Sequence, residues 1–401
     1  MKILFLLLHL DENEKSSSMY TDLIEEFRDN GHDITIMAPS HNNKTYITKE
    51  RGVEVLRVKS RESLGISNMI KKGIALALLP FYYKKAFNKY LSNCKFDWIF
   101  MPTPPITLID FVDYIKNETN SKFYLILRDI HPQSAKSIGL IKYKFMYNYL
   151  AKRAKRGYEI SDFIGCMSQG NIDFIANEYP ELDKSKLVLL LNWQKDTGYD
   201  APKIDIRSKF NYGNKTLILF GGNIGLGQRV ENIYNLASHY SNNDNLVFLI
   251  IGKGVKKESL KELADKNNLS NIHFIDFLPR EEYLDFVKSV DIGLISINEN
   301  YKVPTCPSKA VSYMSLKIPI FAMINPNSDY GDIIQNSGAG YWVVGSKDEQ
   351  TYISLDKMIE SKILRTEMGE NGYKFYLSNL TSKVAYNTII KQIRSLCQNL
   401  V

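Results

Sequence analysis

The sequence predicts an α/β protein made of two doubly wound, Rossmann-like domains, and three observations support this. Short apolar runs alternate with amphipathic segments along nearly the whole chain, which is typical of parallel strands connected by helices. A length of 401 residues exceeds what one hydrophobic core usually serves, and a hydrophobic content of 44% is enough for two cores. The alternation breaks between residues 194 and 214, where glycine, proline and charged residues predict a linker.

The first half of the chain contains seven apolar runs that we predict to be strands. They lie near residues 2–8, 33–38, 53–58, 97–101, 122–128, 162–167 and 186–191. The first run is too short to span a membrane and runs into acidic residues rather than a cleavage site. It is therefore expected to be the first buried strand of a cytoplasmic protein.

The pattern restarts after the linker with six further strands and closes with a helix. These strands are predicted near residues 216–220, 246–251, 271–275, 291–296, 319–324 and 341–344, and the helix at 382–398. We therefore place an N-terminal domain at residues 1–195 and a C-terminal domain at 196–379. The terminal segment, about residues 380–401, is expected to pack back on the N-terminal domain.

Residues 303–310 read Val-Pro-Thr-Cys-Pro-Ser-Lys-Ala and connect a predicted strand to an amphipathic segment. Proline is favoured at the first position of a helix, so Pro307 predicts a helix start with free backbone N–H groups. Ser308 can donate a hydroxyl and Lys309 adds a positive charge. This chemistry suits a phosphate or diphosphate, although an ordinary helix start has the same pattern.

A second loop of this kind reads Gly-Gly-Asn-Ile-Gly-Leu-Gly-Gln over residues 221–228. Its glycines would let the backbone approach a ligand, although their spacing is not that of a dinucleotide fingerprint. A third turn, Gly-Lys-Gly at residues 252–254, follows the next predicted strand. Because the carboxyl ends of parallel strands meet at one edge of a sheet, we expect the three loops to form one anion-binding site.

Together with Arg-Asp-Ile-His-Pro-Gln-Ser at residues 128–134, these motifs resemble the retaining family 4 glycosyltransferases of the GT-B fold. The resemblance covers essentially the whole chain, and it is to the branch that includes proposed L-fucosamine transferases of O-antigen and capsule synthesis. It implies two Rossmann-like domains that face each other across a cleft. It also implies a UDP-sugar donor bound mainly by the C-terminal domain, an acceptor bound mainly by the N-terminal domain, and neither metal nor cofactor.

The resemblance further implies which residues bind the donor, with Phe277 and Leu278 beside the nucleobase. The set is Gly222, Asn223, Gly225, Gln228, Gly252, Lys253, Phe277, Leu278, Pro307, Ser308, Lys309 and Ser312. Family members usually have an arginine and a lysine where this chain has Asn223 and Gln228, so Lys309 would neutralise more of the diphosphate charge. They also have two glutamates where this chain has Pro304 and Ser312. Ser312 is equally well explained as a helix residue facing its sheet.

On the acceptor side, Arg128 and Asp129 follow a predicted strand, and we assign the catalytic role to them. At the carboxyl end of a strand, Asp129 could orient the acceptor hydroxyl or accept its proton. It could instead cap a helix near Pro132. His9, Ser17, Ser18 and His131 are further candidates on the acceptor side, and His131 is more readily explained by packing.

Positive charge gathers in two segments of the N-terminal half. Residues 57–95 contain nine Lys or Arg and one acid, and residues 142–156 contain six and no acid, in a chain of net charge +7. In the first segment the bases alternate with aromatic and aliphatic residues, which is typical of an interfacial helix. We predict that both segments bind an anionic membrane surface. The alternative is a solvated lysine-rich face; no nucleic-acid motif accompanies the segments, and no nucleic-acid partner is expected.

The resemblance implies a metal-independent glycosyltransferase, and the charge pattern predicts that it is peripheral on the inner face of the cell membrane. It would transfer an N-acetylated amino or deoxyamino sugar from a UDP-sugar to a polyprenyl-diphosphate-linked saccharide. Two alternatives stay open: a nucleotide-sugar epimerase of the same fold, and a non-catalytic sugar-nucleotide-binding subunit of a polysaccharide assembly complex. The four cysteines lie far apart without metal-ligand spacing, so neither a disulfide nor structural zinc is expected.

Overall fold

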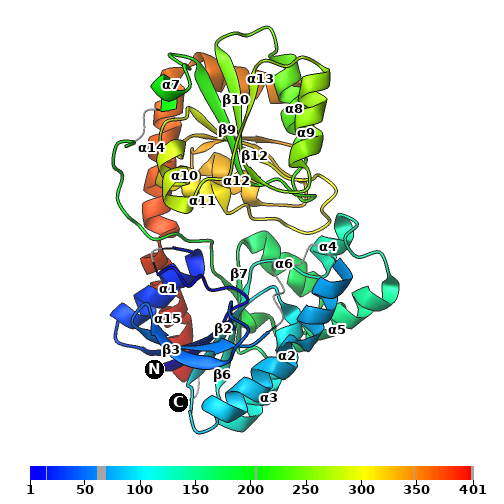
Figure 1. Ribbon diagram of the computed structural model, residues 1–401, viewed down its shortest axis with the longest axis vertical. Helices are drawn as coiled ribbons and strands as arrows, with labels where there is room; N and C mark the ends of the chain where they lie inside the picture. The colour runs from blue at the N-terminus through cyan, green and yellow to red at the C-terminus, as the bar shows by residue number, and fades with distance from the viewer. Residues whose placement is uncertain (15, 61–68, 204–205, 347, 399–401) are drawn as a thin grey trace. The chain divides into compact units, whose positions relative to one another are not determined.

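The computed structural model describes residues 1–14, 16–60, 69–203, 206–346 and 348–398, with the backbone alone at 69–72, 280–281 and 397–398. The chain divides into two compact units, Met1–Leu191 with Tyr386–Val401, and Asn192–Ala385. The domain ends expected from the sequence, residues 195 and 379, lie close to these. Each unit contains its own sheet, and both are α/β, as the alternation of strands and helices predicted (Figure 1).

The sheet of the first unit has eight strands in the order β3-β4-β2-β1-β5-β6-β7-β8, and all pairs are parallel except β3 with β4. The bounds are β1 Lys2–Leu6, β2 Asp33–Pro39, β3 Tyr46–Glu50, β4 Val53–Val58, β5 Trp98–Pro102, β6 Lys122–Leu127, β7 Phe163–Cys166 and β8 Leu187–Leu189. The sequence did not predict β3. None of its residues is fully buried, so it lacks the apolar run that marks the other strands.

Helices cover both faces of this sheet: α1 and α15 lie on one face, and α2, α3 and α5 on the other (Figure 1). The bounds are α1 Met19–Asp29, α2 Met69–Tyr90, α3 Ile109–Thr119, α4 Gln133–Ser137, α5 Lys144–Ile160, α6 Gln169–Glu178 and α15 Ser382–Gln398, with short 3-10 helices η1 Ile106–Leu108 and η2 Lys184–Lys186. Aromatic rings fill the space between sheet and helices; for example, Phe100 stacks on Phe5 and on Tyr124.

The C-terminal helix α15 packs against the first unit from Tyr386 onward. The hydroxyl of Tyr386 lies 3.0 Å from His32 Nε2, and the hydroxyl of Tyr124 donates to Gln392 Oε1 at 2.7 Å. Gln392 Nε2 in turn donates to the carbonyl of Leu189. These contacts make the end of the chain part of the first unit's core.

The second unit has a six-stranded parallel sheet in the order β11-β10-β9-β12-β13-β14. The strands are β9 Thr216–Asn223, β10 Leu246–Lys253, β11 Ile272–Ile275, β12 Ile292–Ser296, β13 Ile320–Met323 and β14 Gly340–Val343. The helices are α7 Ile206–Lys209, α8 Val230–His239, α9 Lys257–Lys266, α10 Arg280–Val287, α11 Lys309–Ser315, α12 Tyr330–Asn336, α13 Glu349–Glu360 and α14 Lys362–Asn379. Every strand predicted in this half of the chain is present.

Candidate functional site

The sheet order of the second unit places β10, β9 and β12 next to one another, so the three predicted anion-binding loops follow the ends of neighbouring strands. Gly252 pairs with Gly222 in the register of β10 and β9. Gly252 has a φ of +142°, and a Cβ there would lie 1.8 Å from the carbonyl oxygen of Gly222. Only glycine fits this position, and it lets the two strand ends approach closely.

Packing accounts for part of the glycine content of the 221–228 loop. A Cβ on Gly221 would meet the Tyr283 hydroxyl at 2.2 Å, and one on Gly227 would meet the Tyr301 hydroxyl at 2.5 Å. These two glycines therefore make room for aromatic side chains. Gly222 is different: its φ is +104°, and the nearest atom to its Cβ position is Lys309 Cε at 3.4 Å.

Lys309 reaches from the start of α11 to the glycine loop. Its Nζ donates to Gln228 Oε1 at 2.6 Å and lies 4.3 Å from the centre of the Phe220 ring. No carboxylate pairs with Lys309 among the described residues. Burial lowers the pKa of its ammonium group to about 7. The structure thus brings together Gly222, Gln228 and Lys309, which the sequence had named separately.

The predicted helix start is displaced by two residues. Pro307 precedes the helix, Ser308 is the N-cap and Lys309 is the first residue of α11. The Ser308 side chain makes no capping hydrogen bond, and α11 has only seven residues. The expectation that Pro307 occupies the first helical position is therefore wrong, because the Ser308 backbone makes the turn into the helix. The positive charge that α11 brings to the loop is that of the Lys309 side chain.

A second basic group lies at the end of β10. Lys253 Nζ lies 4.3 Å from the centre of the Phe277 ring, which is 56% exposed in the loop between β11 and α10. Leu278 follows it and is half-buried. Asn223 is exposed at the end of β9. If Gly225 carried a Cβ, the side-chain amide of Asn223 would be the nearest group to it. This part of the sheet edge, at the carboxyl ends of β10 and β11, therefore has an exposed aromatic ring beside a lysine.

Arg229 is a further cation beside the glycine loop that we did not select from the sequence. It pairs with Glu231 at 3.6 Å and with Glu299 at 3.2 Å. The backbone N–H of Asn298 donates to the carbonyl of Gly227, which ties the loop that follows β12 to the glycine loop. Because Arg229 already has two carboxylate partners, Lys309 is the less neutralised of the two cations.

Ser312 hydrogen bonds away from this cluster. Its hydroxyl donates to Gln194 Oε1 at 2.9 Å, and Gln194 Nε2 donates to the hydroxyl of Ser315. Gln194 is buried, and its backbone also hydrogen bonds to Leu380 and Ser382. The Ser312 hydroxyl therefore has a structural partner. The sequence did not reveal that Gln194 joins several segments by hydrogen bonds, because this residue looks like a polar residue of the linker.

In the first unit, Arg128 and Asp129 follow β6, as predicted. Thr103, which follows β5, holds their backbone: its hydroxyl accepts from the N–H of Arg128 at 3.2 Å and donates to the carbonyl of Asp129 at 3.4 Å. The side chain of Arg128 hydrogen bonds to Tyr20 on α1. Tyr20 is a residue that the sequence did not reveal, because its contact depends on how α1 folds against the sheet.

Asp129 does not cap a helix. The N-cap of α4 is Pro132, and no side chain caps that helix. Crowding by protein atoms raises the pKa of the Asp129 carboxyl to about 6, and the nearby Arg128 opposes the shift. The residue nevertheless exposes part of its surface to water. A partly exposed carboxyl with a raised pKa is suited to accepting or holding a proton.

The other acceptor-side candidates have varied surroundings. Ser18 caps α1 by accepting from the N–H of Thr21, and Ser17 donates to Asp22 Oδ1 at 2.7 Å. His9 lies in the loop after β1, which ends at Leu6 rather than at residue 8, and its ring centre is 6.0 Å from that of His41. His131 is half-buried, burial lowers its pKa, and its Nδ1 has no hydrogen-bond partner.

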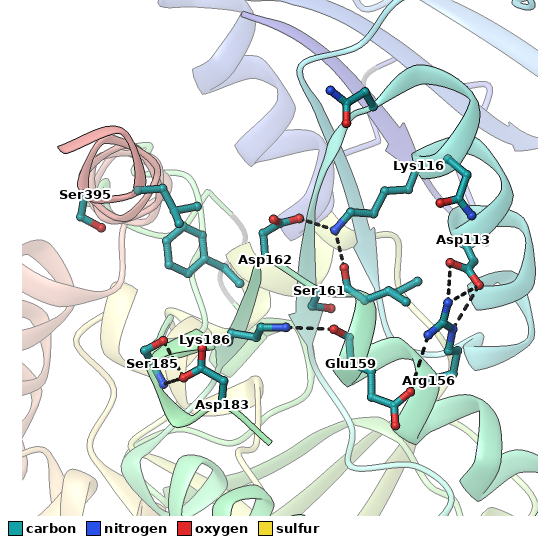
Figure 2. Close-up of a pocket in the computed structure, with 15 residues that line it drawn as sticks. Asp113, Lys116, Arg156, Glu159, Ser161, Asp162, Asp183, Ser185, Lys186 and Ser395 are labelled. Atoms are coloured by element: carbon teal, nitrogen blue, oxygen red, sulfur yellow. Dashed lines mark hydrogen bonds and ion pairs between the residues drawn. The ribbon is translucent and has the colours of Figure 1, made fainter. Parts of the chain in front are cut away.

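A pocket of about 480 Å³ lies in the first unit, between the ends of α3 and α5, η2 and α15 (Figure 2). Its charges are mostly paired within the protein. Lys116 binds Asp162 at 2.6 Å, and Arg156 binds Asp113 at 2.8 Å. None of the residues predicted to bind donor or acceptor lines it. We therefore do not place the reaction there.

Among the described residues, no three His, Cys, Asp or Glu side chains are grouped so that they could hold a metal ion. Cys94, Cys166 and Cys306 form no disulfide with one another, and the side chain of Cys397 lies outside the described part of the chain. No helix within the described ranges is long and apolar enough to cross a membrane.

Known proteins resemble this chain in sequence and in fold. Residues 203–375, most of the second unit, match the family described as Glycosyl transferases group 1. The probable glycosyltransferase WbjE of Pseudomonas aeruginosa is 24% identical over 252 residues, 61% of this chain and 62% of WbjE. The proposed colanic acid biosynthesis glycosyltransferase WcaI of Escherichia coli K12 is 28% identical over 135 residues, 32% of this chain and 33% of WcaI.

The chain thus covers less than two thirds of the length of either relative. The similarity of fold extends over the whole chain. The crystal structure of Anabaena Alr3699/HepE in complex with UDP covers 98% of this chain and 100% of its own, with a TM-score of 0.68 and 13% identity. The second unit therefore resembles the group 1 glycosyltransferase family in sequence, and the whole chain has the GT-B fold.

Proposed function

We propose that this protein is a retaining glycosyltransferase that moves a sugar from a UDP-sugar to a polyprenyl-diphosphate-linked saccharide. The observation that carries the proposal is the cluster of Gly222 at the end of β9, Gln228 in the loop that follows it and Lys309 at the start of α11. A lysine that has no carboxylate partner in the described part of the chain, next to a close backbone turn, suits a ligand that brings negative charge. A nucleoside diphosphate supplies that charge and leaves as UDP when the bond to sugar C1 breaks.

The same edge of the second unit's sheet supplies the other donor contacts that we propose. Phe277 offers an exposed ring on which a nucleobase can stack, and Lys253 lies beside it. Ser312 is engaged with Gln194, so we do not rely on it for the ribose. In the acceptor step, the attacking hydroxyl forms the new bond to C1 and its proton passes to the departing phosphate. Asp129 and Arg128 would orient the acceptor rather than supply a strong base.

The relatives support the class of reaction and the type of product. WbjE is described as a glycosyltransferase, WcaI is assigned to colanic acid biosynthesis, and HepE was crystallised with UDP. From these names we infer a role in polysaccharide biosynthesis and a uridine nucleotide as donor. An N-acetylated amino or deoxyamino sugar, as in the L-fucosamine branch, is the donor sugar that we propose.

The test is to incubate the protein with labelled UDP-sugars, with and without a polyprenyl-diphosphate-linked acceptor. We expect label to move to the lipid fraction only when the acceptor is present. Lys309→Ala should slow that transfer by about tenfold to a thousandfold, since removing one electrostatic donor has effects of this size. A control at an exposed lysine of α9, Lys261→Ala, should leave the rate unchanged.

Two outcomes would replace the proposal. Conversion of the UDP-sugar to its epimer without acceptor would indicate a nucleotide-sugar epimerase. Binding of UDP-sugars with neither transfer nor isomerisation across the panel would indicate a non-catalytic binding subunit.

A further inference from the structure

We propose that the first unit docks on an anionic lipid bilayer through one exposed surface on α2 and the start of α5, which we call the α2–α5 surface. Its apolar members are Ile74, Leu78, Phe81, Tyr143, Phe145 and Tyr149. This inference goes beyond the transfer reaction and does not depend on it, because lipid binding can be measured without any sugar nucleotide.

Helix α2 has apolar residues on two faces. Leu79, Tyr83 and Phe87 are buried in the first unit, so they are not available to lipid. The expectation that the whole segment is an interfacial helix is therefore too broad, because several of its apolar residues belong to the core. On the outward face, Ile74, Leu78 and Phe81 are 50%, 38% and 63% exposed. Their spacing of four and three residues places them in one row, where a helix facing water would carry polar residues.

The start of α5 exposes three aromatic rings. Tyr143 is 64% exposed, Phe145 is 74% exposed and Tyr149 is 42% exposed. The rings of Tyr143 and Phe145 lie against each other, with centres 5.8 Å apart. Aromatic side chains are favoured at the boundary between lipid and water, because an apolar ring and a polar group can each find a suitable environment there.

The charge of the α2–α5 surface complements an anionic membrane. Its lysines have no carboxylate partner among the described residues: Lys84, Lys85, Lys142, Lys144 and Lys152. Residues 63–96 and 130–158 contain no Asp or Glu at all. These uncompensated charges suit anionic headgroups better than neutral ones.

Several bases that the sequence assigned to the membrane do not belong to this surface. Arg57 is fully buried and pairs with Glu50. Arg153, Lys155 and Arg156 pair with Asp110, Glu181 and Asp113. Residues 61–68 and the side chains of Lys71 and Lys72 lie outside the described part of the chain. The membrane contact therefore rests on fewer lysines than the sequence alone indicated, together with exposed aromatic residues of both segments.

The two parts of the surface belong to one layer of the first unit. Helices α2 and α5 both pack against α3 and against η1, and Figure 1 shows them on the same side of the sheet. A bilayer can therefore be reached by both helices from one side of this unit. A lipid-linked acceptor would then be held near the first unit by the membrane itself.

Flotation with phosphatidylcholine vesicles, with and without phosphatidylglycerol, tests the proposal on the full chain. We expect recovery with phosphatidylglycerol vesicles to exceed recovery with neutral vesicles by about tenfold at low salt, and to fall as salt screens the lysines. The double variant Lys144→Gln with Phe145→Ser should lose at least about two thirds of that recovery. Its matched control on the exposed edge strand β3, Ile47→Ser with Lys49→Gln, should float like the wild type.

The same measurements can overturn the inference. Equal flotation with both vesicle types, or no flotation, would show that this surface does not bind anionic lipid. The same conclusion would follow if the Lys144→Gln, Phe145→Ser variant floated like the wild type with an unchanged melting temperature. A wild type that dimerises without lipid, and a variant that stays monomeric, would assign the surface to a second copy of the chain. Loss of sugar transfer with flotation intact would count against the proposed function alone.

Discussion

Lys309 lies in a protein environment that favours its neutral form. The ammonium group has an amide oxygen and a ring face as partners, and neither carries a full opposite charge. Burial consequently lowers its pKa to about 7. In the ligand-free protein, this lysine therefore adds to stability as the pH rises from 7 towards its ordinary pKa near 10.5, and that contribution is lost as the pH falls through 7. A bound diphosphate would reverse the preference by favouring the charged form.

This coupling predicts that UDP affinity depends on pH. Above pH 7 the free lysine is neutral and must take up a proton when UDP binds, so the affinity should fall by up to about tenfold per pH unit between pH 7 and 9. The phosphates of UDP are already ionised in this range, because their last pKa lies near 6. Titration calorimetry in two buffers of different ionisation enthalpy measures both the affinity and the proton uptake.

Lys309→Arg is the matched variant, because a guanidinium stays charged throughout this range. Its UDP affinity should be nearly constant from pH 7 to 9, with no proton uptake. A wild type whose affinity is flat over the same range would show that Lys309 does not contact the diphosphate, or that it is charged before binding.

Asp129 has a raised pKa, so its ionised form costs stability in the folded protein. Asp129→Asn removes that charge and keeps the shape. We expect it to leave the melting temperature unchanged or higher, to leave UDP affinity within about twofold, and to slow transfer by about a hundredfold, since acid–base and positioning groups contribute on this scale. Transfer kinetics, UDP titration and thermal melting check the three parts. A full transfer rate, or a lowered melting temperature with no change in rate, would make Asp129 a structural residue.

Individual site residues were predictable only in part. Lys309, Gln228 and Gly222 could be selected because their types and positions fit an anion site, and in the structure Lys309 hydrogen bonds to Gln228 and lies beside Gly222. Ser312 has a partner, Gln194, that lies far from it in the sequence. Tyr20 likewise meets Arg128 only because α1 and the end of β6 come together in the fold. Contacts between residues distant in sequence have no local pattern from which they can be read.

The close approach of β9 and β10 requires glycine at position 252. Because a Cβ on Gly252 would overlap the Gly222 carbonyl, Gly252→Ala must push the two strand ends apart. We expect a loss of unfolding free energy of about 2–3 kcal/mol, together with weakened UDP binding. Gly213→Ala is the control: it also has a positive φ, of +53°, but its Cβ would lie in open space.

The Gly213→Ala control separates the cost of placing alanine at a positive φ from the cost of an overlap between its Cβ and a neighbouring strand. Gly213→Ala should cost about 1 kcal/mol and should leave UDP binding unchanged. Urea unfolding and UDP titration of both variants give the comparison. If the two variants lose the same stability and both bind UDP like the wild type, the narrow approach of β9 and β10 is not required by the site.

Strands with an apolar run were predictable, and strands without one were not. All thirteen predicted strands occur within a few residues of their expected positions, because buried parallel strands are nearly continuous apolar segments. The edge strand β3 is antiparallel and half-exposed, so its sequence resembles a loop. Helix α2 was located correctly, but its buried and exposed faces could not be separated, since both carry apolar residues.

The whole chain consists of two units that each have a complete sheet and core. In the second unit, strand order alone sets the three candidate anion-binding loops side by side. In the first unit, the same arrangement sets the loops after β5 and β6 together, where Thr103 holds Arg128 and Asp129. We therefore keep the prediction that the second unit binds the donor and the first unit the acceptor.

The central claim is that the second unit binds a nucleoside diphosphate through Lys309 and the glycine loop, and calorimetric titration of UDP, UMP and uridine tests it most directly. The wild type should bind UDP at least about tenfold more tightly than UMP, and UMP more tightly than uridine. In Lys309→Met the preference for UDP over UMP should largely disappear while the melting temperature is retained. Equal affinity of the wild type for UDP and uridine, or an unchanged preference in Lys309→Met, would contradict the claim.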